Sequence, residues 1–381
     1  MKPLKVAREQ QVAIFGEAGS GKTVLLSSFY GAAQEPAFAA RNLYNIVAND
    51  ASQGRQLHQN YLGMKNAAST PMANRFAGSR YVFSVKRRPT AAGKKGRSAT
   101  EDLRMVWHDY PGEWFEEEPA TDEEQHRRTE TFRALLGSDV AVLLVDAQRL
   151  LDQAGEEERY LKALLTNYST HLSRLRGEIT PDGKRLVKFP RVWMFGLSKS
   201  DLLPEMDVTG FRDLMVEKVG HEISRLQEEL AAFIDEPDAF SLGEDFVLLS
   251  SAQFKPGTID VSKQVGVRLM LPIAAMLPFS RHLRWAKALR NGSKVANELL
   301  NSAGPILTLV ATRLKLPKLL RFVAAGLPLI ANPVMEHSQE KLQSLYDRAT
   351  DKHDFLTAVL VGFQLDLSQA KEEKVLLESV K

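Results

Sequence analysis

The chain has 381 residues, enough for one large or two ordinary domains, and its 44% hydrophobic and 25% charged residues are typical of a folded globular protein. A formal net charge of +3 gives no indication of a nucleic-acid-binding protein, so nucleic acid is not an expected partner. The sequence contains no cysteine, which excludes disulfide bonds and thiolate metal sites and fits the reducing cytoplasm, and residues 1–11 lack the pattern of a signal peptide.

The N-terminal part of the chain predicts a strand, a phosphate-binding loop and a helix. Residues 11–15 are apolar and stop at Gly16, and a helical pattern starts at Gly21. The loop between them matches G-x-x-x-x-G-K-[ST] in full. Its glycines let successive N–H groups point at phosphate oxygens, beside the positive end of the helix. We therefore expect a nucleoside triphosphate here, with Lys22 at the β- and γ-phosphates and the Thr23 hydroxyl on Mg²⁺. The predicted nucleotide-binding residues of this loop are Gly16, Glu17, Ala18, Gly19, Ser20, Gly21, Lys22, Thr23 and Val24.

The next part of the chain predicts an insert and a hairpin. Residues 31–79 show no strong period and predict a long irregular insert, which in a compact domain is more often functional or mobile than structural. Residues 80–85 and 103–108 predict two strands, and the basic connector 86–97 predicts the exposed tip between them. The second strand leads into Asp109-Tyr110-Pro111-Gly112, a D-x-x-G sequence.

The middle of the chain alternates between strands and helices. Continuous apolar runs predict strands that are buried on both faces of a parallel sheet, and helical patterns separate them. This alternation predicts an α/β fold with a doubly wound, mostly parallel sheet of the P-loop NTPase kind and one antiparallel strand pair at the hairpin. The predicted strands are residues 140–145, 192–197 and 246–249, and the predicted helices are residues 121–136, 156–176, 209–233 and 261–276.

Two further motifs follow predicted strands and favour guanine as the base. Ser198-Lys199-Ser200-Asp201 is close to the N/T-K-x-D signature, in which the aspartate accepts both the N1–H and the N2 amine of guanine and the lysine stem covers the base plane. Adenine offers neither of these donors to the aspartate. The alternative is that Asp201 only starts a helix. The pair Ser251 and Ala252 matches the short S-A motif, whose backbone N–H contacts guanine O6.

These four motifs occur in one order, each where a strand ends, and over residues 10–275 the sequence resembles the TRAFAC-type P-loop GTPases. The stretch 109–114 (DYPGEW) is also similar to bacterial YcjX-like proteins and to the GTPase domains of bacterial conflict systems. The resemblance implies a GTPase that binds GTP and GDP with Mg²⁺. It also implies that Asp109 holds the metal ion, usually through water, and that the Gly112 N–H senses the γ-phosphate.

The sequence departs from this family at two catalytic positions. Many members carry a glutamine after D-x-x-G that orients the attacking water, but here the residue is Glu113. Since a carboxylate is repelled by the γ-phosphate, we expect hydrolysis that is slow or depends on a partner. The family also uses a switch-I threonine before the second strand, for which Thr70 is the best candidate and Ser79 the alternative. The expected catalytic residues are thus Lys22, Thr70 and Glu113.

The C-terminal part of the chain predicts a different kind of structure. From residue 277 onward no further strand is expected, so the predicted division is a GTPase domain at 1–276 and an all-helical subdomain at 277–381. Two apolar runs in the C-terminal part of the chain, 269–279 and 322–335, are too short to span a membrane. Four basic residues alternate with leucines and favour a buried helix, with peripheral contact with an anionic membrane as the alternative. They are Arg313, Lys315, Lys318 and Arg321.

Three functions remain open on the sequence alone. The first is a GTPase that acts as a switch on a protein effector or with an activator. The second is an ATP-dependent ATPase, because Ser198 replaces the usual asparagine and Glu113 the usual glutamine. The third is a nearly inactive scaffold that nucleotide only stabilises. The sequence gives no indication of the oligomeric state.

Overall fold

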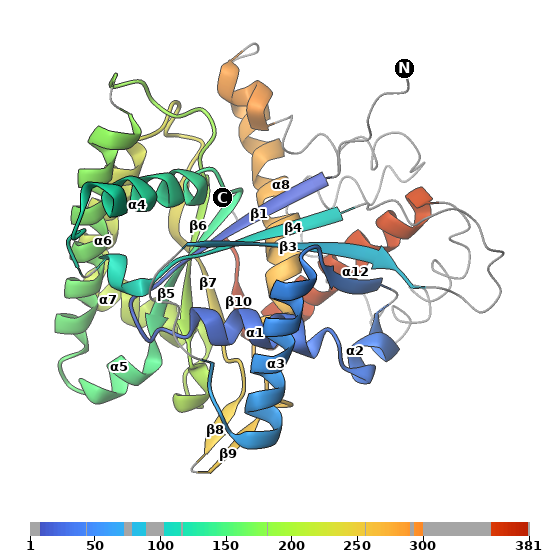
Figure 1. The fold of residues 1–381 in the computed structure, drawn as a ribbon. Coiled ribbons are helices and arrows are strands. Elements are labelled where there is room, and N and C mark those ends of the chain that lie inside the picture. The colour runs from blue at the N-terminus through green and yellow to red at the C-terminus, as the bar shows by residue number, and fades with distance from the viewer. Residues whose placement is uncertain are drawn as a thin grey trace.

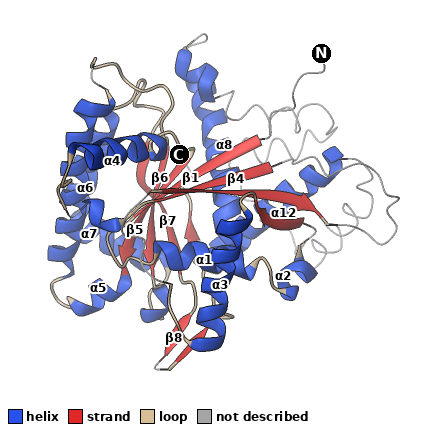
Figure 2. Cartoon of the chain, in the orientation of Figure 1, coloured by secondary structure: helices blue, strands red, loops and turns tan. Residues whose placement is uncertain are grey.

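The structure is a computed structural model that describes residues 8–42, 44–71, 78–88, 103–115, 117–180, 182–255, 257–289, 293–299 and 352–379. An eight-stranded sheet runs through the molecule, with helices on both of its faces (Figures 1 and 2). The strands are β1 (Arg8–Phe15), β2 (Tyr44–Ala48), β3 (Ser79–Arg87), β4 (Leu103–Asp109), β5 (Val140–Asp146), β6 (Val192–Ser198), β7 (Ser241–Leu249), β8 (Gln253–Lys255), β9 (Thr258–Asp260) and β10 (Leu376–Leu377). The helices are α1 (Lys22–Ala32), α2 (Pro36–Arg41), α3 (Ala51–Ala67), α4 (Asp122–Leu135), α5 (Ala147–Asp152), α6 (Glu157–Ile179), α7 (Val208–Ala231), α8 (Met270–Ala288) and α12 (Lys352–Glu372), with short 3-10 turns η1 (Gly112–Phe115), η2 (Ser200–Leu202) and η3 (Val267–Leu269).

The order of strands across the sheet is β10-β7-β6-β5-β1-β4-β3-β2. The five central strands, β7, β6, β5, β1 and β4, are parallel to one another, and β3 pairs antiparallel with β4 as the predicted hairpin requires. Two further antiparallel strands close the edges, β2 beside β3 and β10 beside β7. The fold is therefore the predicted α/β, doubly wound sheet of the P-loop NTPase kind.

The strands form because their side chains are apolar on both faces, and each face packs against its own helices. In β1, Val12 and Ile14 belong to the cluster with α1, α8 and α12, whereas Ala13 and Phe15 belong to the cluster with α4, α6 and α7. Successive strand residues point to opposite faces, so one apolar run supplies both cores. The central strands are thus held rigidly, and their carboxyl ends become fixed supports for loops.

The structure corrects the predicted irregular insert at residues 31–79. This segment contains α2, the edge strand β2 and the seventeen-residue helix α3. Helix α3 starts where the Asp50 side chain accepts hydrogen bonds from the N–H groups of Ser52 and Gln53, which is an ordinary N-cap. Its buried residues, Gly54, Leu57, Tyr61 and Met64, are spaced three or four apart and face the fold.

The C-terminal part also differs from the prediction. The expectation of no strand after residue 277 is wrong, since β10 pairs with β7. The helix predicted at 261–276 instead begins at Met270 and runs to Ala288, across the predicted boundary at 276. Leu277 of α8 lies in the same buried cluster as Val12 of β1, so α8 packs on the central sheet. The division of the chain into two domains stays a prediction.

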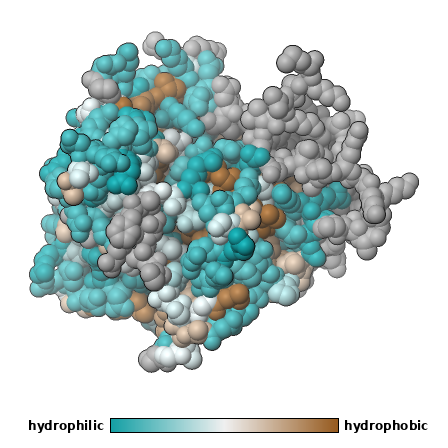
Figure 3. Space-filling model, viewed as in Figure 1, coloured by the Kyte–Doolittle hydropathy of each residue, from teal (hydrophilic) through white to brown (hydrophobic). Residues whose placement is uncertain are grey.

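Several segments considered in the sequence analysis lie outside the described residues. These are most of the basic hairpin tip, the apolar run 322–335 and the four basic residues Arg313, Lys315, Lys318 and Arg321. Among the helices that are described, none combines the length and apolar character needed to cross a bilayer. The face shown in Figure 3 is mostly hydrophilic, with small separated apolar patches.

Candidate functional site

The predicted motifs lie at the carboxyl ends of neighbouring strands. The P-loop follows β1, D-x-x-G ends β4, the SKSD sequence follows β6 and the S-A pair follows β7. In the sheet order β7-β6-β5-β1-β4, the two base motifs are therefore neighbours, and so are the two phosphate motifs. Strand β5 lies between these pairs. Its carboxyl end, where helix α5 starts, thus lies between the two predicted base motifs and the two predicted phosphate motifs.

A cavity of about 460 Å³ lies at this edge of the sheet and joins all four motifs. That volume is within the range of small-molecule binding sites. Fourteen predicted site residues line it: Ala18, Gly19, Ser20, Gly21, Lys22, Thr23, Val24, Thr70, Gly112, Glu113, Ser198, Lys199, Asp201 and Ser251. Four other predicted residues are not part of this lining: Gly16, Glu17, Asp109 and Ala252. All four are buried. The lining also includes Gln148, Leu202 and Phe254, which the sequence analysis did not single out.

The P-loop has the backbone that its glycines predict. Gly19 and Gly21 have φ angles of 77° and 89°, in the left-handed region that other residues rarely adopt. The ammonium of Lys22 lies within the loop and donates to the carbonyl oxygens of Gly16 (2.6 Å) and Glu17 (3.1 Å). The loop is therefore already curled around a positive charge, which is the arrangement that binds phosphate.

Tyr110, inside the D-x-x-G sequence, ties β4 to the P-loop. Its hydroxyl accepts a hydrogen bond from the N–H of Gly16 at 2.8 Å and donates to the carbonyl of the same residue at 3.3 Å. The ammonium of Lys22 lies 5.0 Å from the centroid of the Tyr110 ring, within range of a cation–π contact. An unspecified position of D-x-x-G thus helps to shape the phosphate loop, and no general motif would have revealed it.

Asp109 is a buried carboxylate at the end of β4. The residue is 2% exposed, and neither carboxylate oxygen makes a hydrogen bond of normal geometry to the described residues. Burial raises the pKa of Asp109 to about 6, and the charge of Lys22 opposes this shift. A buried carboxylate without hydrogen bonds is costly unless a cation compensates it. Together with the Thr23 hydroxyl, it offers the oxygen ligands that Mg²⁺ prefers.

Gly112 packs directly on the P-loop. A Cβ atom at this position would lie 2.3 Å from the backbone nitrogen of Ala18 and 2.5 Å from the carbonyl carbon of Glu17. Both are backbone atoms that cannot rotate away, so only glycine fits here. The D-x-x-G loop and the P-loop are therefore in backbone contact, so a shift of one loop would displace the other. Glu113 and Thr70 both line the cavity, on η1 and after α3 respectively.

Asp201 is held in place by neighbours from the S-A loop. The Ser250 hydroxyl lies 2.7 Å from Oδ1 of Asp201, and the backbone N–H of Phe254 lies 3.4 Å from Oδ2. Asp201 is thus a positioned acceptor at the cavity wall, and it does not cap an α-helix, since the residue lies within the single turn η2. Ser198, which replaces the family asparagine, donates to the carbonyl of Val145 on the neighbouring strand at 3.2 Å.

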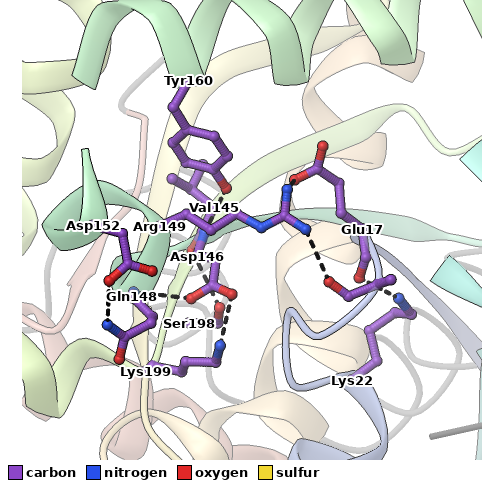
Figure 4. A network of polar contacts seen from close by, with 11 residues as sticks. Glu17, Lys22, Val145, Asp146, Gln148, Arg149, Asp152, Tyr160, Ser198 and Lys199 are labelled. Carbon is purple, nitrogen blue, oxygen red and sulfur yellow. Dashed lines mark hydrogen bonds and ion pairs between the residues drawn. The ribbon is translucent and has the colours of Figure 1, made fainter. Parts of the chain in front are cut away.

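A polar network around α5 was not predicted from the sequence (Figure 4). Asp146, 3% exposed at the end of β5, accepts from the Lys199 ammonium at 2.7 Å and from the Gln148 backbone N–H at 2.9 Å. On the phosphate side, Arg149 forms an ion pair with Glu17, with Nη1 and Oε2 2.9 Å apart. The only sequence signal for these contacts was a carboxylate that directly follows an apolar strand.

Comparisons with known proteins add little to this geometry. No family model matches the chain, and no curated protein matches it. Among the solved structures that match is the Roco2 RocCORdC protein of Methanosarcina barkeri bound to GDP. It is 14% identical and covers 78% of this chain and 68% of its own, with a TM-score of 0.23. A TM-score this low carries no structural argument. The likeness of residues 109–114 to YcjX-like proteins has no support here and stays a prediction.

Proposed function

We propose that this protein binds GTP together with Mg²⁺ and hydrolyses it to GDP and phosphate, acting as a nucleotide-dependent switch. The observation that carries the proposal is the cavity that Lys22, Gly112 and Asp201 line together. A phosphate-binding loop alone would fit any nucleotide. A positioned carboxylate on the opposite part of the same cavity fits a purine that carries two adjacent N–H donors.

The phosphate side of the cavity fits a triphosphate. The Lys22 ammonium would exchange the carbonyls of Gly16 and Glu17 for β- and γ-phosphate oxygens, which are stronger partners because they are charged. Thr23 and Asp109 are the residues that would hold Mg²⁺. The ion would supply positive charge to the phosphate oxygens and to the buried Asp109 carboxylate.

The base side of the cavity favours guanine. Hydrogen bonds from Ser250 and Phe254 orient the Asp201 carboxylate and leave it able to accept further hydrogen bonds, since two carboxylate oxygens offer about four acceptor positions. Lys199, which lines the same cavity, donates a hydrogen bond from its ammonium to the Asp146 carboxylate. In this arrangement the Asp201 carboxylate would accept hydrogen bonds from the N1–H and the N2 amine of guanine, as the SKSD sequence predicts.

Hydrolysis would depend on the residues that touch the γ-phosphate side. Gly112 contacts the P-loop backbone and can report the presence of the γ-phosphate to the segment after it. Thr70 and Glu113 line the same cavity, and we assign them to the positioning of the γ-phosphate side and of the attacking water. Because Glu113 is acidic, we propose that turnover is slow or is raised by a protein activator. A cytoplasmic location and a protein effector belong to the same proposal, and peripheral contact of the C-terminal part with an anionic membrane is its alternative to a buried helix.

The test is turnover of GTP and of ATP by the purified full chain, in Mg²⁺ and in EDTA, with Lys22→Ala beside wild type. We expect Mg²⁺-dependent turnover of GTP. We also expect Lys22→Ala to bind GTP ten- to a hundredfold more weakly, because one charge-assisted contact contributes ~1.5–3 kcal/mol. Lys162→Ala, on the exposed face of α6, serves as the control and should bind GTP as tightly as wild type does.

Turnover of ATP alone would favour the ATPase, and tight binding without turnover would favour the scaffold. Unchanged GTP affinity in a folded Lys22→Ala variant would remove the P-loop assignment.

A further inference from the structure

The P-loop of this protein carries a carboxylate in an unfavourable place. Glu17 is the second residue of the loop, its side chain is 9% exposed, and its own carbonyl accepts from the Lys22 ammonium. A bound triphosphate would bring several negative charges to the same loop. Like charges at close range in a partly buried site repel strongly, so an uncompensated Glu17 would oppose the ligand that the rest of the loop attracts.

Arg149 provides the compensating charge, and its place is fixed by the fold. It lies in the first turn of α5, directly beyond the end of β5, and α5 is anchored there because Asp146 caps its N-terminus. From this turn the guanidinium reaches Glu17, with Nη1 2.9 Å from Oε2. Figure 4 shows the Arg149 side chain lying across to the P-loop, between Glu17 and the loop backbone.

The same guanidinium also contacts the backbone of the loop. Its Nη2 donates to the carbonyl oxygen of Ala18 at 3.2 Å. Since the carbonyl and N–H of one peptide unit point in opposite directions, holding this oxygen also fixes the direction of the Gly19 N–H. Gly19 lines the cavity, and N–H groups of this loop are the donors expected for phosphate.

We propose that Arg149 is a positioning residue of the phosphate site, which neutralises Glu17 and orients the Ala18–Gly19 peptide so that the loop accepts a triphosphate. The inference rests on the proposed binding of a nucleoside triphosphate. It predicts a dependence on ligand charge. Loss of Arg149 should weaken binding of GTP more than binding of GDP, because the uncompensated Glu17 charge repels the more highly charged ligand more strongly. It also predicts that removing the Glu17 charge restores most of what was lost.

The experiment is calorimetric titration of the full chain with GTP and with GDP in Mg²⁺. The proteins compared are wild type, Arg149→Gln, Glu17→Gln and the double variant. We expect Arg149→Gln to weaken GTP about ten- to a hundredfold and GDP by a clearly smaller factor. The double variant should recover to within about fivefold of wild type, and Glu17→Gln should bind GTP at least as tightly as wild type. Arg159→Gln is the matched control, since Arg159 is 76% exposed and pairs with Glu156 on the surface, and it should match wild type.

Four results would count against the inference in different ways. GTP affinity that is unchanged in Arg149→Gln would overturn it. A double variant as weak as Arg149→Gln would show that Arg149 does not act through Glu17, and would overturn it as well. Wild-type protein that binds no triphosphate would overturn the proposed function itself, and this inference with it. Should the double variant fail to fold, Glu17→Gln alone decides, because weaker GTP binding there contradicts the repulsion on which the inference depends.

Discussion

Glu113 stands next to Gly112 in the turn η1 and lines the cavity at the side of the P-loop. Its neighbour is fixed against the backbone of Ala18, so the position of Glu113 relative to the phosphate loop is constrained by the fold. Next to a bound triphosphate, the sign of the side-chain charge at this position would matter more than the size of the side chain. The residue is therefore the most direct point at which to alter hydrolysis without changing binding of the base.

Glu113→Gln should leave GTP turnover unchanged or increase it. The substitution removes a negative charge beside the γ-phosphate and supplies an amide that can orient water. The measurement is single-turnover hydrolysis of GTP at saturating protein, with Glu123→Gln on the exposed start of α4 as control. A loss of a hundredfold or more, the scale typical of a missing general base, would instead make Glu113 a direct participant in the reaction.

The helices α1 and α3 connect the phosphate site to the predicted switch region. Helix α1 begins at Lys22, and α3 ends at Ala67, shortly before Thr70. The two helices meet at Gly31, where an added Cβ would lie 2.1 Å from Cγ and 2.3 Å from Cβ of Tyr61. Since Tyr61 Cβ is bonded to the backbone, no rotamer change can relieve that contact. The spacing of the two helices thus depends on one glycine.

Gly31→Ala should destabilise the protein by ~1–3 kcal/mol, although alanine is the better helix former, because overpacking forces α3 away from α1. Gly177→Ala in α6 provides the opposite control. That glycine is exposed and has nothing within 4 Å of an added Cβ, so alanine should stabilise by up to about 1 kcal/mol. Thermal unfolding of both variants measures the difference. A Gly31→Ala protein at least as stable as wild type would show that α3 is free to move.

The elements that the sequence predicted differ from those it did not predict in how much of their surface is buried and in their length. The central strands were found because both of their faces are buried, which leaves a continuous apolar run such as residues 140–145. Helix α3 was missed because only a narrow stripe of its surface is buried. Strand β10 was missed because two residues are too few to show an alternating pattern of apolar and polar side chains. In the site, the motif loops were found because phosphate and guanine chemistry dictates their residues. Arg149 was missed because its partner Glu17 is distant in sequence and only the fold brings them together.

At the scale of the whole molecule, a buried ion pair joins α8, the sheet and the C-terminal strand. Arg281 of α8 is 1% exposed, and its Nη2 lies 2.7 Å from Oδ1 of Asp245 in β7. The same carboxylate oxygen accepts from the N–H of Ser379, just after β10, at 2.9 Å. Burial raises the pKa of Asp245 to about 6, against the pull of the Arg281 charge, so the carboxylate is ionised at pH 8.

Asp245→Asn should lower the free energy of unfolding by ~3–5 kcal/mol at pH 8. An arginine cannot lose its proton in a protein, so the substitution leaves a buried cation whose remaining carboxylate partner, Glu244, is 4.0 Å away. The urea midpoint, followed by tryptophan fluorescence, reports the change. Asp213→Asn, which breaks an exposed pair with Arg212, should stay within about 0.5 kcal/mol of wild type. Equal midpoints for the two variants would mean that the buried pair does not hold the C-terminal part on the sheet.

The central claim is that one cavity binds the guanine base of GTP at Asp201 and its triphosphate at the P-loop. Its most direct test is competition between GTP, ATP and xanthosine triphosphate for the wild type and for Asp201→Asn, all in Mg²⁺. Wild type should prefer GTP over ATP by at least about a hundredfold, because two hydrogen bonds to a charged acceptor contribute ~1.5–3 kcal/mol each. Asp201→Asn should prefer xanthosine triphosphate over GTP, since its amide can donate to the second carbonyl of xanthine. A wild type that binds ATP as tightly as GTP, or a base preference that Asp201→Asn leaves unchanged, would contradict the account.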